Sequence, residues 1–155
     1  MRLSLLGMRD NLASERFLLT LWVGSLCAIG YLAVPMAFAT LGDVTLAGNY
    51  AGELFRVVNY IGIGAGLVLI ISKFVSQGKS VTKTWRFSVL LIMWFISLLF
   101  VFYLLPETDL LKHQKHLSTA LSERFGLFHT LSTNIYLFLT LLGLSLVVSS
   151  DKVES

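Results

Sequence analysis

One apolar stretch of the chain carries polar residues that could do chemistry. Within residues 125–148, spacings of three, four and seven from His129 place Ser132, Thr133 and Tyr136 on the same helix face, with Asn134 set to the side. Histidine titrates near neutral pH, and such a face could hold a proton or a small ligand. The competing interpretation is hydrogen bonding between helices, because polar groups in lipid are costly without partners. Both interpretations predict that this face points into a helix bundle.

A pair of charged residues lies at the edge of another apolar stretch. Glu53 and Arg56 are three residues apart, a spacing that allows an ion pair on one helix face. Such a pair at an interface contributes little to stability by itself. The sharper hypothesis is that both residues meet His129 at a similar depth in the membrane. The predicted site for a ligand or proton is therefore one polar cluster of Glu53, Arg56, His129, Ser132 and Asn134.

Other kinds of site have less support. His113 and His116 have the spacing of two metal ligands on one helix face, but Lys112 and Lys115 beside them repel a cation. A b-type haem needs two axial ligands inside the membrane, and only His129 lies there. No carboxylate within the membrane stands near His129 in the sequence to complete a serine–histidine–aspartate arrangement, and only Glu53 could serve, if folding brings it close. We therefore predict no metal, no cofactor and no catalytic residue.

Four long apolar segments must position the predicted site. The 155-residue chain is 55% hydrophobic and 14% charged, with a mean hydropathy of +0.78, as expected for a chain whose solvent is lipid. A helix of about 20 apolar residues crosses the hydrocarbon core of a bilayer. The sequence therefore predicts a single all-α transmembrane domain, an integral membrane four-helix bundle. The expected spans are 17–40, 45–74, 86–105 and 125–148.

Lys and Arg residues are shared unequally between the two sides of this arrangement. The two tails and the connection between spans two and three hold eight of them, whereas the other side holds four. Segments rich in Lys and Arg stay in the cytoplasm. Both termini are therefore expected to be cytoplasmic, with the protein in a bacterial inner membrane. The formal charge of +3 reflects this topology, so no nucleic-acid partner is expected.

Two segments could be something other than a membrane span or a loop, namely a surface helix and a signal peptide. The stretch from Thr108 to Arg124 has leucines at helical spacing and is predicted to be an amphipathic helix on the outer membrane surface. The first apolar segment could be a signal peptide, since residues 37–39 have the small-x-small form of a cleavage site. The run is too long for that, which favours an uncleaved span. Pro35 is expected to bend this helix.

Glycine spacing indicates close packing between helices. Gly62 and Gly66 are four residues apart, so they share a face that lets another backbone approach, and Gly24 and Ala28 have the same spacing. A phosphate-binding loop at residues 62–66 is disfavoured because no strand precedes it. Gly24, Gly62 and Gly66 are thus the predicted helix-packing positions.

Two stretches of the chain have a pattern found in a known family. The first runs from Leu21 to Phe55 and includes Pro35 and the Gly-Glu-Leu-Phe sequence of residues 52–55; the second is residues 124–134. Both resemble the transmembrane protein 205-like family, a bacterial and eukaryotic domain of unknown function. The resemblance implies a small four-helix integral membrane protein without a settled activity. It also implies that recurring family positions coincide with Pro35, residues 52–55, His129, Ser132 and Asn134.

Three hypotheses for function follow. The first is a membrane protein that binds or moves a small solute or proton through the predicted cluster. The second is a structural or accessory subunit that packs its glycine faces against a second copy or a partner membrane protein and has no chemistry of its own. The third and weakest is a membrane enzyme. The first requires that Glu53 and His129 meet and open to water; the second requires only that the polar groups find partners.

Overall fold

The structure is a computed structural model that describes residues 2–114 and 118–149, and side chains within these ranges except those of residues 2–13, 77, 79 and 113. Every described element is a helix. The elements in chain order are α1 (Arg2–Ala28), η1 (Ile29–Ala33), α2 (Val34–Thr40), α3 (Val44–Gln77), η2 (Gly78–Lys83), α4 (Trp85–Leu99), η3 (Phe100–Leu104), α5 (Leu105–Gln114) and α6 (Thr119–Val148).

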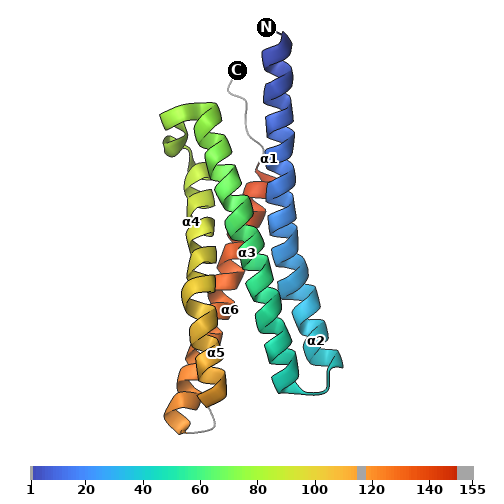
Figure 1. Ribbon diagram of the computed structural model, residues 1–155, viewed down its shortest axis with the longest axis vertical. Coiled ribbons are helices and arrows are strands. Elements are labelled where there is room, and N and C mark those ends of the chain that lie inside the picture. The colour runs from blue at the N-terminus through green and yellow to red at the C-terminus, as the bar shows by residue number, and fades with distance from the viewer. Residues whose placement is uncertain (1, 115–117, 150–155) are drawn as a thin grey trace.

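Four continuous helical stretches are long and apolar enough to cross a membrane. They are Ser14–Thr40, Val44–Ser76, Trp85–Lys112 and Thr119–Val148. Figure 1 shows them side by side as an elongated bundle, with the start of α1 and the end of α6 at the same end. We call this the tail end and the opposite one, where α2 turns into α3, the far end. The predicted four-helix membrane bundle is confirmed.

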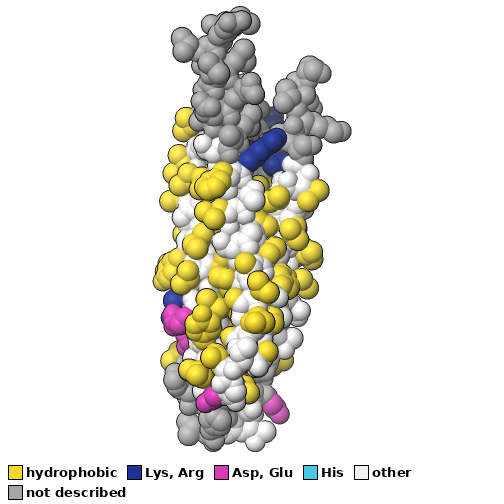
Figure 2. Space-filling model, turned by 90° about the vertical axis from the view of Figure 1, so that its right-hand side faces the viewer, with side chains coloured by type: hydrophobic (Ala, Val, Ile, Leu, Met, Phe, Trp, Pro, Cys, Tyr) yellow, Lys and Arg dark blue, Asp and Glu magenta, His cyan; other side chains and the backbone are white. Residues whose placement is uncertain are grey.

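The order of the helices around the bundle follows from their contacts. α1 packs on α3 and on α6, and α4 also packs on α3 and on α6. The fully buried side chains at the centre include Trp22, Leu26, Met93 and Leu139, which come from three of the four spans. Large apolar side chains such as Phe102 and Leu127 cover the outside, as the yellow surface of Figure 2 shows. An apolar exterior of this kind suits contact with lipid acyl chains.

Short local signals end and restart the helices. The side chain of Asp43 caps α3 by accepting hydrogen bonds from the backbone N–H groups of Thr45 at 2.7 Å and Leu46 at 3.2 Å. Gly42 before it has φ +66°, a conformation that favours glycine. At the other end of α3, Gly78 with φ +60° stops the helix. These residues fix the two turns that connect α3 to its neighbours.

Both prolines of the chain follow a widened helical turn. The π-helical turn η1 ends two residues before Pro35, and the π-helical turn η3 ends two residues before Pro106. A proline ring clashes with the carbonyl four residues earlier, and a π turn moves that carbonyl away. The helix axis can therefore continue through each proline, so that α1, η1 and α2 form one span and α4, η3 and α5 form another.

The polar stretch between spans three and four differs in detail from the expected surface helix. Residues 105–114 continue the third span as α5, and residues 119–124 form the first turns of α6. Leu111 of α5 is buried, and Asp109 of α5 pairs with α3, so contacts with the bundle hold this segment along the bundle axis. The spans are accordingly longer at the far end than the predicted limits of 105 and 125.

Candidate functional site

Arg56 of α3 is the centre of an ion-pair cluster at the far end. Its guanidinium donates a hydrogen bond to Glu53, one turn earlier on the same helix, and another to Asp109 Oδ2 of α5 at 2.8 Å. Lys112 Nζ lies 3.5 Å from Asp109 Oδ1. We call these four residues the α3–α5 cluster. Their charges cancel, so the cluster is electrically neutral and ties two helices together.

A glycine face on α3 lets Lys112 reach the cluster. Its ammonium donates a hydrogen bond to the carbonyl oxygen of Gly48 at 3.0 Å, and its side chain is only 17% exposed. A Cβ atom on Gly52 would lie 3.4 Å from Lys112 Nζ, closer than most Cβ contacts in proteins. Glycine at position 52 therefore makes room for a cation against the helix backbone.

The sequence prediction is only partly reproduced at this site. Glu53 and Arg56 do pair with each other, but the second hydrogen bond of Arg56 runs to Asp109, and neither residue bonds to His129 among the described residues. The reason is that His129 does not lie at the same depth as Glu53 and Arg56. Phe55 of α3 contacts Tyr136 of α6, with ring centroids 4.8 Å apart, and His129 lies about 10 Å along the helix axis from Tyr136.

The remaining predicted residues lie on α6 and divide between two faces. His129 is exposed, and its ring stacks on Phe125 of the same helix at 6.0 Å between centroids. Asn134 is also exposed. Ser132 is half-buried, and its hydroxyl oxygen has no hydrogen-bond partner among the described residues. α6 therefore turns His129 and Asn134 outward, although both were expected to face the bundle.

Two of the three predicted packing glycines meet neighbouring helices. A Cβ on Gly62 would collide with the indole of Trp22 and lie 3.1 Å from Ser97 Oγ, and a Cβ on Gly66 would lie 2.6 Å from Trp94 Cδ1. Gly24 is exposed, with no atom within 4 Å of such a Cβ, so it takes no part in packing within the described chain. The reason is rotational: α1 turns the neighbouring Trp22 inward, which leaves Gly24 outside.

A buried polar layer in the middle of the bundle was missed from the sequence. Asn59 of α3 and Ser97 of α4 are fully buried, as is Trp22 of α1. Asn59 donates to the carbonyl of Phe55 at 2.8 Å, but within the described part of the chain its side-chain oxygen has no hydrogen-bond partner, nor do Trp22 Nε1 and Ser97 Oγ. The isolated Asn59 inside a long apolar run was the available signal, because a polar residue there needs a partner.

Charged residues at the tail end are arranged differently. Glu15 of α1 accepts hydrogen bonds from Lys73 Nζ at 3.1 Å and from Ser72 Oγ at 2.8 Å, both on α3. Arg86 of α4 donates to the backbone carbonyl of Ser149, just beyond α6. These bonds join α1 to α3 and α4 to α6 at the level where the spans end.

No group of three or more histidine, cysteine and acidic side chains suited to a metal occurs within the described residues. His116 lies outside them, and the side chain of His113 does not belong to them, so the structure does not bear on this pair. Cys27, the one cysteine of the sequence, is half-buried in α1 as a free thiol.

Comparison with known proteins identifies a family for this arrangement. The model of a domain of unknown function, DUF4149, matches residues 17–117, which is most of the first three spans and the α3–α5 cluster. The chain belongs to the DUF4149 family. No curated protein and no solved structure matches the chain. Membership of DUF4149 agrees with a small membrane protein and assigns no activity to the α3–α5 cluster.

Proposed function

We propose that this DUF4149 protein is an accessory subunit that associates with another transmembrane helix through the outward face of α6 and carries no chemistry of its own. The observation behind the proposal is Asn134. Its amide is exposed, and at about 1.5 Å per residue it lies about 13 Å deeper than Phe125, near the middle of a hydrocarbon core about 30 Å thick.

An amide at that depth favours a protein partner over lipid. Lipid tails offer it no hydrogen bonds, whereas an asparagine on a facing helix can satisfy it, a contact worth about 1–2 kcal/mol at most. Thr133, one residue earlier, instead bonds back to the carbonyl of His129 at 2.9 Å on its own helix. Asn134 is therefore the polar group on this face that gains most from association.

The same face has the small residues that close helix approach requires. Gly126, Thr130 and Asn134 are spaced four residues apart, and all three are exposed. A Cβ on Gly126 would have no atom within 4 Å. Small residues at this spacing allow two helices to pack closely in a membrane. His129 flanks this stripe and could add a hydrogen bond to the same partner.

Crosslinking in native membranes tests the proposal. A photoreactive residue at Thr130 should form a protein adduct, with a second copy or another membrane protein, that Asn134→Leu reduces severalfold. The control position is Phe102 of η3, whose side chain is 74% exposed and should react with lipid only. Adducts with lipid alone at both positions would overturn the proposal.

A second candidate is the binding or movement of a small solute or proton at the predicted cluster. It is favoured by Glu53, whose carboxylate is 66% exposed beside a cation. Proteoliposomes loaded with a pH-sensitive dye provide the test: proton movement that Glu53→Gln abolishes would support this function. The neutral, mutually paired charges of the α3–α5 cluster favour the accessory role instead.

Three further details belong to the same proposal. Cytoplasmic termini and residence in a bacterial inner membrane rest on the unequal distribution of Lys and Arg. The narrower resemblance to the transmembrane protein 205-like family rests on residues 21–55 and 124–134. Association with a second copy is the simplest form of the accessory role, because it needs no other component.

A further inference from the structure

The tail end of the bundle contains two adjoining hollows where the spans end. One is lined by residues of α1, α3, α4 and α6, and its neighbour by α1, α4 and α6. The second has a volume of about 180 Å³, and since about 10–15 Å³ is enough for one water molecule, it can hold a polar group of several atoms. Arg16 and Arg86 line both hollows.

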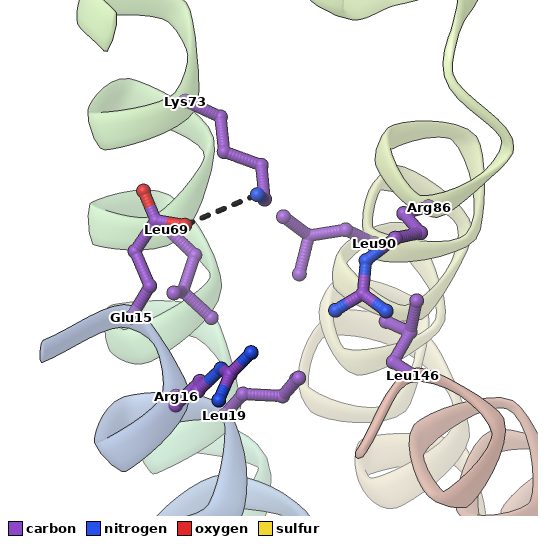
Figure 3. A pocket seen from close by; sticks show the side chains of 8 residues that line it. All are labelled: Glu15, Arg16, Leu19, Leu69, Lys73, Arg86, Leu90 and Leu146. Carbon is purple, nitrogen blue, oxygen red and sulfur yellow. Dashed lines mark hydrogen bonds and ion pairs between the residues drawn. The ribbon is translucent and has the colours of Figure 1, made fainter. Parts of the chain in front are cut away.

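The charged side chains around the first hollow differ in whether they form an ion pair. Lys73 and Glu15 form an ion pair at 3.1 Å, and both side chains are only 13% exposed, so their charges cancel. Arg16 is exposed and makes no hydrogen bond or ion pair within the described residues. Figure 3 shows the guanidinium groups of Arg16 and Arg86 pointing into the same space from α1 and α4. Among the described residues, Arg16 therefore brings a positive charge to this space that no carboxylate balances.

The position and the lining of the hollow indicate an amphiphilic anion. Arg16 lies near the start of the first span and Arg86 near the start of the third, which is the level of the lipid headgroups. Guanidinium groups bind phosphate oxygens in pairs. The apolar part of the wall consists of four buried leucines, Leu19, Leu69, Leu90 and Leu146. A phosphate joined to acyl chains satisfies both parts at once, and basic pockets between transmembrane helices are suited to anionic headgroups.

We propose that the two adjoining hollows together form a binding site for the phosphate headgroup of an anionic phospholipid, with Arg16 as the main ligand and Arg86 as the second. Arg86 is positioned by its hydrogen bond to the carbonyl of Ser149. A bound headgroup would then contact α1 and α4, which lie across the bundle from each other and share few direct contacts. The lipid would link them at the tail end.

The experiment compares lipids and variants on the purified full-length protein. Phosphatidylglycerol or phosphatidylcholine is added in detergent, and the bound lipid is counted by native mass spectrometry. We expect retention of phosphatidylglycerol, and about tenfold weaker binding in Arg16→Gln, which loses charge-assisted hydrogen bonds. Arg16→Lys should fall between the two because it keeps the charge without the paired geometry.

Two controls keep the result specific. Arg124→Gln removes the same charge from an exposed position near the start of α6, at the far end, and should bind phosphatidylglycerol like the wild type. Melting temperatures in detergent show whether each variant is folded. Equal binding by the wild type and a folded Arg16→Gln variant, or equal loss in Arg124→Gln, would overturn the site.

A third arm separates the two sources of phosphate. Millimolar inorganic phosphate should leave the bound lipid in place, because it offers nothing to the leucine wall. If inorganic phosphate displaces phosphatidylglycerol fully, the assignment to a phospholipid is wrong.

Discussion

The two ends of the bundle use the same charged residue types for different purposes. At the far end, the α3–α5 cluster alternates acid and base and is neutral. At the tail end, one ion pair between Glu15 and Lys73 leaves Arg16 without a carboxylate among the described residues. On the face shown in Figure 2, most of the Lys and Arg atoms gather near one end, whereas acidic side chains with one basic group beside them lie toward the other.

The difference shows how charge balance decides between a structural tie and a receptor. Where each cation has a carboxylate within reach, the group joins helices and offers little to a ligand. Where a cation lacks one and faces a hollow, an external anion can supply the missing charge. The far end therefore behaves as a fastening between α3 and α5, and the tail end as a candidate binding site.

The largest effect expected concerns the side of the membrane that each end occupies. Reporter fusions after Lys83 and Ser155 should read cytoplasmic, and a fusion after Lys115 should read external, because the tail end has the excess of Lys and Arg. Activity of a periplasmic phosphatase reporter measures this as an all-or-none result. The reverse pattern would place the basic hollows outside.

Next in size is the disruption of the packed middle that holds the two ends together. Gly62→Leu should destabilise the bundle by about 3 kcal/mol, since the new side chain collides with Trp22. Unfolding in mixed detergent micelles measures the loss. Gly64→Leu is the matched control two residues away, because a Cβ on Gly64 has no atom within 4 Å. Equal losses in both variants would show that the cause is not the contact with Trp22.

Removing one charge from the α3–α5 cluster should have a smaller effect. Asp109→Asn takes away the carboxylate that joins Arg56 to Lys112, and we expect a loss of about 1 kcal/mol in the free energy of unfolding, because the pair is about one-third exposed and partly screened. Glu107→Gln, on the same helix and outside the cluster, is the control. If the two variants unfold alike, the cluster is not a fastening.

The smallest effect is expected at Glu53. Its carboxylate is 66% exposed, so Glu53→Gln should cost about 0.5 kcal/mol or less. The same unfolding measurement, repeated at high salt, should remove even this difference. A loss larger than that of Asp109→Asn would mean that Glu53 has a partner beyond Arg56, as the solute-binding alternative requires.

The sequence by itself determined the architecture. Four apolar stretches of sufficient length specify four spans, since a backbone in lipid must satisfy its own hydrogen bonds within helices. Pro35 was expected to bend the first helix, and the π turn η1 lies just before it. The spacing of Gly62 and Gly66 predicted a packing face, and in the structure both glycines lie against tryptophan side chains. Each of these signals is local, because it depends only on residues within a few turns of one helix.

Tertiary structure alone decided which residues meet across helices. Arg56 pairs with Asp109 because α5 packs on α3. On α6, in contrast, Tyr136 is the residue beside Phe55 of α3, so His129 lies about 10 Å along the axis from that level. Gly24 and Gly62 both have a small residue four positions later, yet one faces outward and the other a tryptophan. The rotation and the relative depth of each helix are set by its contacts with neighbouring helices, and the spacing of residues within a single helix does not determine them.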